Sequence, residues 1–186
     1  MPKVLVPLAI GFEELEAVTI IDLLRRAGVE VVSAGLAAGP VTGSRGTVLL
    51  PDATLDEALK QEYDMVVLPG GMPGAKHLNE DPRIKPLLRQ MADSGKFTGA
   101  ICAAPFVLAE AGLLAGKRAT SYPGFVDKMD LPDVRYVKDA VVIDGKVITS
   151  RGPGTAMDFA LALIELLVNK AKRDEVEAGL QRPGKY

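Results

Sequence analysis

Short apolar runs along this chain are separated by longer stretches in which apolar and polar positions follow a helical period. The runs are too short for buried helices and are rich in valine, leucine and isoleucine, a pattern typical of strands covered on both faces. They predict strands at Val4–Ala9, Val29–Ala34, Asp64–Leu68 and Phe97–Ile101. Pro7 has no N–H for a sheet hydrogen bond, so we place it near the end of its strand or on an unpaired side.

Helix-end signals delimit the amphipathic stretches between these strands. Glu13–Ala27 has acidic residues in its first turn, Arg25-Arg26 in its last turn and Gly28 directly after it, an arrangement that complements the helix dipole. The same criteria predict further helices at Asp56–Gln61, Pro82–Ser94, Ala103–Ala111, Thr155–Asn169 and 171–179.

Two segments are predicted to form hairpins. Residues 40–50 have the pattern of a small hairpin, and Asp144-Gly145 between Asp139–Ile143 and Lys146–Ser150 predicts a type I′ turn. Strands that alternate with helices indicate an α/β fold, in which helices cover both faces of a mostly parallel sheet. With 186 residues and no internal repeat or linker, the chain is expected to form a single domain over residues 1–186.

Composition and charge exclude several classes of protein. With 22 basic and 24 acidic residues the net charge is −2, so we expect no nucleic-acid partner and no binding to an anionic membrane. One cysteine and one histidine cannot form an internal disulfide or a zinc site of the usual Cys/His type. No apolar stretch is long enough to span a bilayer and the N-terminus lacks the layout of a signal peptide, so we expect a cytoplasmic protein without a metal.

Cys102 is the first candidate for chemistry, because the active site of an open α/β sheet forms at the carboxyl ends of its strands. It follows Ile101 there, and its small neighbours allow the sharp turn that exposes a nucleophile. Amides at the start of the next helix are expected to lower the pKa of the thiol from about 8.5. The alternative is a small buried hydrophobic residue, which is how most lone cysteines behave.

Gly70-Gly71 and three glutamates accompany Cys102 at this edge. Backbone N–H groups of a Pro-Gly-Gly turn can stabilise an oxyanion, although glycine after a strand most often forms only a turn. Glu16 shares a helical face with apolar residues and would point inward, but periodicity does not separate it from Glu13. The alternative for all three acids, Glu14 included, is a favourable charge in the first helical turn.

A carboxyl group beside a thiolate has a specific electrostatic consequence. Two anions about 4 Å apart repel by about 4 kcal/mol at an effective dielectric constant of about 20. The two groups therefore do not ionise together, and the carboxyl stays protonated and donates a hydrogen bond to the thiolate. Such a carboxyl can serve first as an acid and later as a base.

Two other motifs have weaker links to chemistry. His77 is the only imidazole, but it lies on a short segment after the glycine turn and is expected at the surface or behind the site. The segment Arg151–Thr155 resembles an anion-binding helix start. It lacks the lysine of a phosphate-binding loop and the third glycine of a dinucleotide fingerprint.

Five motifs in order along the chain resemble the ThiJ/PfpI superfamily, in particular the DJ-one type, the branch of the parkinsonism-associated protein deglycase. They are Gly11–Glu16, Leu24–Gly28, Val67–Gly71, Ala100–Pro105 and Thr149–Thr155. The resemblance implies a flavodoxin-like three-layer α/β sandwich that is usually a homodimer and uses no cofactor.

By the same resemblance, Cys102 is expected to be an oxidisable nucleophile and Glu16 the protonated acid that contacts it. Gly71 and Ala103 would supply backbone N–H groups, and further residues would line the site, namely Gly70, Arg45 and Tyr122. Several relatives have a histidine where this chain has Tyr122, which cannot act as an imidazole base at neutral pH. That departure puts a Cys–His mechanism in doubt.

The resemblance implies a cysteine-dependent, cofactor-free enzyme acting on reactive dicarbonyls or glycated adducts. Glyoxalase III-like or protein deglycase activity and protection against oxidative stress are expected. The alternative is a redox-sensing chaperone that responds through oxidation of Cys102. A cysteine peptidase or amidase is a minor alternative, because the peptidase-like branch has histidine at the position of Ala103. Class I glutamine amidotransferases need a downstream histidine, and none follows His77.

Overall fold

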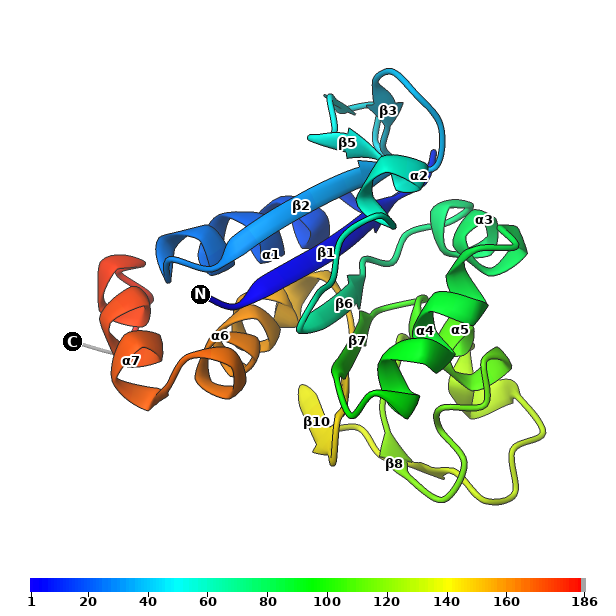
Figure 1. Ribbon diagram of the computed structural model, residues 1–186. Helices are drawn as coiled ribbons and strands as arrows, with labels where there is room; N and C mark the ends of the chain where they lie inside the picture. Colours follow the sequence, from blue (N-terminus) through cyan, green and yellow to red (C-terminus); the bar gives the residue numbers. More distant parts are fainter. Residues whose placement is uncertain (185–186) are drawn as a thin grey trace.

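The computed structural model describes residues 1–184, which form a seven-stranded sheet between two layers of helices (Figure 1). The strands of this sheet are β1 Lys3–Leu8, β2 Glu30–Gly35, β5 Ala53–Thr54, β6 Met65–Leu68, β7 Phe97–Ile101, β10 Val141–Asp144 and β11 Val147–Ser150. Their order across the sheet is β10-β11-β7-β6-β1-β2-β5, and only β10 runs antiparallel to its neighbour. The prediction of an α/β fold with a mostly parallel sheet is confirmed.

Helices cover both faces, because successive residues of a strand point to opposite sides of the sheet. In β1, Val4 and Val6 belong to one core layer and Leu5 to the other. The first layer packs against α1 Glu14–Arg26, α6 Ala156–Leu167 and α7 Lys170–Gly179. The second packs against α2 Leu55–Ala58, α3 Gly74–Glu80, α4 Ile84–Asp93 and α5 Pro105–Glu110. None of the helices within residues 1–184 is long and apolar enough to cross a bilayer.

Short elements complete the fold. The predicted hairpin in residues 40–50 consists of β3 Val41–Thr42 and β4 Val48–Leu49. Strands β8 Arg118–Ala119 and β9 Arg135–Tyr136 form a separate parallel pair, and 3₁₀ turns lie at Val126–Lys128 and Pro153–Thr155. Four short elements were not predicted from the sequence, namely β5, α3, β8 and β9, because segments of two to seven residues show little periodicity.

The turn between β10 and β11 differs from the prediction. Asp144 pairs with Val147, so the turn residues are Gly145 and Lys146 rather than Asp144-Gly145. Of the two, only Gly145 has a positive φ, +61°. That matches a type II′ turn, with glycine at the first central position, whereas type I′ requires a positive φ at both. Pro7 lies next to the end of β1, beyond the residues that pair with β6, as expected.

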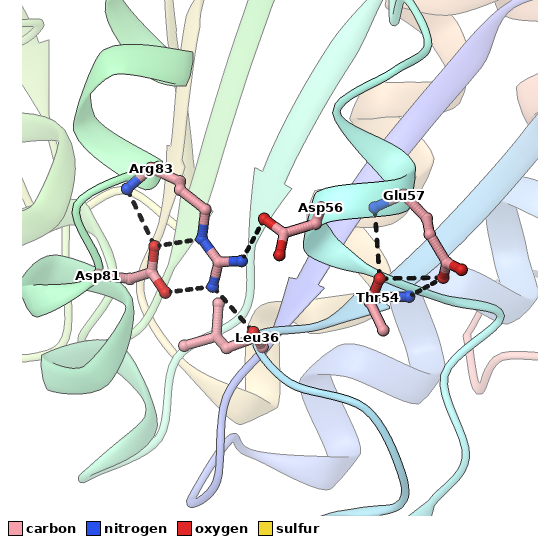
Figure 2. A network of polar contacts seen from close by, with 6 residues as sticks. All are labelled: Leu36, Thr54, Asp56, Glu57, Asp81 and Arg83. Atoms are coloured by element: carbon pink, nitrogen blue, oxygen red, sulfur yellow. Dashed lines mark hydrogen bonds and ion pairs between the residues drawn. The ribbon is translucent and has the colours of Figure 1, made fainter.

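Arg83 connects the loop after β2 to α2 and to the start of α4 (Figure 2). Its guanidinium donates to both carboxylate oxygens of Asp81, at 2.9 and 2.6 Å, and to Asp56 at 2.7 Å. It also donates to the Leu36 carbonyl at 2.8 Å, while a capping box at Thr54 begins α2 in the same view. These bonds tie the loop after β2, the helix α2 and the start of α4 together.

Candidate active site

Cys102 directly follows β7 and has a left-handed backbone conformation, φ +63°, which is uncommon for a residue with a side chain. Two backbone hydrogen bonds hold it there. The Cys102 N–H donates to the Ser150 carbonyl at 3.0 Å, and the Tyr122 N–H donates to the Cys102 carbonyl at 2.8 Å. The sharp turn expected from the small neighbours of Cys102 is therefore present, although α5 begins only at Pro105.

The glycine turn after β6 brings bare backbone against this cysteine. A Cβ at Gly70 would lie 2.7 Å from the Cys102 Cβ and 2.8 Å from an oxygen of Glu16, so no larger residue fits. Gly71 has φ +87°, and a Cβ there would lie 2.3 Å from the backbone nitrogen of Glu13. The glycines thus allow three segments to meet: the turn after β6, the start of α1 and the end of β7.

Glu16 is fully buried beneath the turn, 0% exposed. Its Oε2 accepts the Gly70 N–H at 2.8 Å, whereas Oε1 has no hydrogen-bond partner within residues 1–184. Burial raises the pKa of Glu16 to about 7, and the interactions with Cys102 and the Gly70 N–H only partly oppose this rise. Near neutral pH the carboxyl therefore exchanges a proton readily.

The Cys102 thiol does not have the lowered pKa expected from the sequence. Burial, the charge of Glu16 and a hydrogen bond with its carboxyl raise the pKa of the thiol to about 12. The N–H groups of Gly71 and Ala103 donate to the sulfur and lower it, but they do not prevail. The sulfur is buried and precedes the first turn of α5, so the helix amides count for less than expected. Protonation of Glu16 removes the like-charge contribution, so the two groups titrate as a coupled pair.

A pocket of about 310 Å³ opens above the sulfur. Of the residues expected to line the site, Arg45 and Tyr122 reach this pocket together with Gly71 and Ala103, whereas Gly70 lies below it against Glu16. Part of the pocket wall was not predicted from the sequence, namely the part made by Ser44, Met72, Phe125 and Pro153. Met72 and Pro153 adjoin motifs already recognised, but nothing in the sequence singled out Ser44 or Phe125.

Glu14 holds the loop that carries Arg45. Its Oε1 accepts the backbone N–H groups of Arg45 at 2.7 Å and Thr47 at 3.1 Å. Burial raises the pKa of Glu14, but these bonds, its own backbone N–H and the Ser44 hydroxyl more than offset that effect and lower it. The Arg45 side chain is exposed at the pocket, and no ion pair within residues 1–184 involves it.

The side chains of His77 and Arg151 have partners other than Cys102 and Glu16. His77 is half-buried, and its Nδ1 lies 2.9 Å from the Ile10 carbonyl oxygen. The guanidinium of Arg151 donates to the Lys138 carbonyl at 3.2 Å. Within the described part of the chain, no cluster of three or more histidine, cysteine, aspartate or glutamate residues could hold a metal ion.

The sequence of this chain is similar to that of a known protein family and of several curated proteins. The profile of the DJ-1/PfpI family matches residues 2–166. The chain is 46% identical over 178 residues to Protein dj-1beta of Drosophila melanogaster, covering 95% of each. It is 40% identical over 164 residues to the Glutathione-independent glyoxalase DJR-1.2 of Caenorhabditis elegans, covering 88% of this chain and 87% of that protein. To Protein DJ-1 homolog B of Arabidopsis thaliana it is 46% identical over 173 residues, yet it spans only 39% of that protein's length.

The fold of this chain also resembles that of solved DJ-1 structures. The crystal structure of Drosophila melanogaster DJ-1beta superposes with a TM-score of 0.92 at 45% identity, covering 96% of this chain and 97% of that one. Oxidized Toxoplasma gondii DJ-1 superposes with a TM-score of 0.93 at 40% identity, covering 98% and 100%. These values confirm the flavodoxin-like fold that the sequence motifs implied.

Proposed function

Because the chain belongs to the DJ-1/PfpI family, we propose that it is a glyoxalase-like enzyme that acts on reactive dicarbonyls without a cofactor. The observation that carries this proposal is the interaction of the Cys102 thiol with the buried Glu16 carboxyl at the base of a pocket. The name of the Caenorhabditis elegans relative supports the same chemistry. A volume of about 310 Å³ suits a substrate as small as methylglyoxal.

The first step is addition of the Cys102 sulfur to the aldehyde carbon of methylglyoxal. In the reactive form the shared proton resides on Glu16 and the negative charge on sulfur. As the carbon–sulfur bond forms, the carbonyl electron pair moves to oxygen, which takes the Glu16 proton and gives a hemithioacetal. The N–H groups of Gly71 and Ala103 stabilise negative charge on sulfur and on the adjacent oxygen.

Glu16, now a carboxylate, removes the proton from the former aldehyde carbon, and the electron pair forms an enediolate. Return of that proton to the neighbouring carbon, with transfer of the hydroxyl proton from the sulfur-bearing carbon to the adjacent oxygen, gives a lactoyl thioester on Cys102. One carbon is oxidised as the other is reduced, so the step needs no external oxidant or reductant. Water then hydrolyses the thioester to lactate and the thiol. A pKa of about 7 suits Glu16 to give and take a proton near neutral pH.

Lactate formation from methylglyoxal tests this proposal. Cys102→Ala removes the nucleophile and should lower the rate at least about 1000-fold. Arg26→Gln is a matched control, because Arg26 is an exposed α1 residue that pairs only with Asp22 among residues 1–184 and lies outside the pocket. Equal rates of lactate formation in the wild type and in Cys102→Ala would refute the proposed enzyme activity.

Deglycation is a finer form of the same proposal. In an adduct of methylglyoxal with a thiol or amine, the Cys102 sulfur would bond to the same carbon while the amine or thiol leaves with the Glu16 proton. Preformed adduct should be turned over while an excess of aminoguanidine removes free aldehyde. If lactate formation stops when free aldehyde is trapped, the enzyme acts on the aldehyde alone.

Redox sensing with a chaperone role is a second candidate function. Hydrogen peroxide would transfer an oxygen atom to the Cys102 thiolate and leave as water, and a second equivalent would give the sulfinate. The N–H groups around the sulfur and the Glu16 proton favour such an anion, and one similar structure is described as oxidized. We also propose a cytoplasmic location, where a lone thiol stays reduced until peroxide rises. Mass spectrometry that finds Cys102 unmodified after mild peroxide, with normal dicarbonyl activity, would exclude the sensor.

Peptidase or amidase activity has less support. The chain has one imidazole, and His77 contacts the Ile10 carbonyl rather than the Cys102 pocket. Within residues 1–184, Glu16 is therefore the only base placed to activate Cys102 and protonate an amine leaving group. We expect no turnover of casein or of small amides. Hydrolysis of either substrate by the wild type that is lost in Cys102→Ala would instead support a peptidase or amidase function.

A second copy of the chain is the partner that we propose for the apolar face beside α1. Leu15 and Val18 lie one turn apart on α1 and are 52% and 45% exposed, and Leu50, which adjoins Val18, is 78% exposed. Light scattering should find a homodimer that Val18→Asp converts to a monomer, while Arg26→Gln leaves it intact. A monomeric wild type would contradict the proposal.

A further inference from the structure

A second cavity lies at the opposite edge of the sheet from Cys102. Its volume is about 470 Å³, larger than the Cys102 pocket of about 310 Å³. Thr98 and Val147, near the amino ends of β7 and β11, form one wall, and the C-terminal part of α4 and the loop after α5 form the others. The two cavities share no lining residue, so the second cavity is not part of the dicarbonyl site.

Basic side chains dominate the polar lining of this cavity. Four of its residues are basic and one is acidic, namely Arg89, Lys96, Lys117, Lys146 and Asp93. Lys96 pairs with Asp64 at 2.9 Å, and Lys117 lies 3.9 Å from Asp144. Arg89 and Lys146 have no carboxylate partner within residues 1–184, so their charges are available to a ligand.

Both of these side chains are held in place. Arg89 Nε donates to the Ala111 carbonyl at 3.1 Å, which anchors the guanidinium at the wall and leaves its terminal nitrogens free of partners within residues 1–184. The Lys146 ammonium lies 3.9 Å from the centroid of the Phe97 ring. Anchoring of this kind reduces the side-chain entropy lost when an anion binds.

Thr98 is an independent indication of a ligand. It lines the cavity, is only 1% exposed, and its hydroxyl takes part in no hydrogen bond among residues 1–184. With no hydrogen-bond partner among the described residues, this hydroxyl is available to a ligand in the cavity. An acceptor atom bound in the cavity would satisfy it.

We propose that this cavity binds a small organic anion, whose carboxylate or phosphate group accepts hydrogen bonds from Arg89 and Thr98. Leu113 and Val147, together with the alanines of the wall, offer apolar surface to the body of the ligand. An anion with an apolar body is therefore preferred over both inorganic phosphate and a neutral molecule of the same shape.

Chemical-shift titration of the isotope-labelled full chain tests this site with defined probes. Phenyl phosphate and benzoate should give saturable shifts at the amides of Gly112 and Lys117, and the stronger of the two identifies the head group. Inorganic phosphate and the neutral benzyl alcohol should bind at least about 10-fold more weakly. Shifts that fail to saturate below about 10 mM for both organic anions would overturn the proposal.

Paired variants locate the ligand. Arg89→Gln and Thr98→Val should each weaken binding about 5- to 10-fold, because each removes a hydrogen bond to a charged group. Thr98→Ser keeps the hydroxyl and Arg26→Gln alters an unrelated surface arginine, so both should bind as the wild type does. Methylglyoxal turnover should remain unchanged in all four, which separates this site from the proposed enzyme. Equal affinity in Thr98→Val and Thr98→Ser, or unaltered binding in Arg89→Gln, would refute the assignment.

Discussion

Glu14 and Glu16 lie two residues apart in the first turn of α1, and both are buried, yet their surroundings favour opposite charges. Glu14 accepts hydrogen bonds from backbone N–H groups and from Ser44, and its pKa is lowered. Glu16 accepts one backbone N–H, from Gly70, and its pKa is raised to about 7. Burial disfavours the carboxylate in both, but Glu16 is buried more deeply and has fewer donors, so the pKa is raised only there.

These surroundings suit Glu14 to a structural role and Glu16 to proton transfer. Glu14 is ionised, and its bonds fix the loop between β3 and β4 beside the pocket. Glu16 keeps an oxygen without a partner and faces a thiol, so it can exchange a proton.

Replacement of each acid by its amide should give the largest contrast. Glu16→Gln preserves the shape of the protonated carboxyl but cannot transfer a proton, so kcat/KM for methylglyoxal should fall by about 100- to 10,000-fold. Glu14→Gln removes a charge outside the reaction and should change kcat/KM only a few-fold. Initial rates of lactate formation measure both.

The stability of the same two variants should show the reverse order. Glu14→Gln weakens bonds to two backbone N–H groups and should cost about 1–2 kcal/mol in the free energy of unfolding by urea. Glu16→Gln relieves a buried carboxyl and should not destabilise the protein near neutral pH. Comparable activity losses in the two variants would mean that Glu16 has no special chemical role.

The pH dependence of stability should distinguish the acids over two separate ranges. Between pH 4.5 and 7 the folded state keeps the Glu16 proton that the unfolded chain has lost, so stability falls as pH rises. The fall amounts to at most about 3 kcal/mol. Glu14, with its lowered pKa, contributes stability above pH 4.5 that is lost as pH drops through its folded pKa.

Urea unfolding at a series of pH values measures these two limbs. Glu16→Gln should flatten the limb between pH 4.5 and 7, and Glu14→Gln should flatten the acid limb. A wild type whose stability does not change between pH 4.5 and 7 would show that Glu16 ionises normally.

Glycines beside the two acids offer a matched pair of steric tests. A Cβ at Gly70 would lie 2.7 Å from the Cys102 Cβ, and one at Gly43 would lie 2.4 Å from the carboxyl carbon of Glu14. Gly70→Ala should separate Cys102 from Glu16 and lower kcat/KM by about 10- to 100-fold. Gly43→Ala should displace the Glu14 carboxyl and lower stability by about 1–3 kcal/mol with little loss of rate. The contrast fails if Gly43→Ala is as inactive as Gly70→Ala.

Much of this architecture follows from sequence patterns, because the apolar strands and the long helices α1, α4 and α6 have clear periodicity or end signals. The position of Cys102 at a strand end was predictable for the same reason. The choice between Glu13 and Glu16 was not, since both align with apolar residues and only the packing of the glycine turn buries Glu16. The thiol pKa was predicted with the wrong sign, because a sequence does not show how deeply a sulfur is buried.

Ser44 gives the smallest and most discriminating test, because this loop residue adjoins Glu13 and Glu14 at the start of α1 and also lines the pocket. Its hydroxyl lies 3.2 Å from oxygens of Glu13 and of Glu14, and it can donate to only one carboxylate at a time. Ser44→Ala should therefore cost about 1 kcal/mol in stability and raise the pKa of Glu14 slightly. The rate with methylglyoxal should change less than about 3-fold. A larger loss of rate would mean that the structural acid and the reactive pair are coupled through this loop, and the separation between Glu14 and Glu16 would no longer hold.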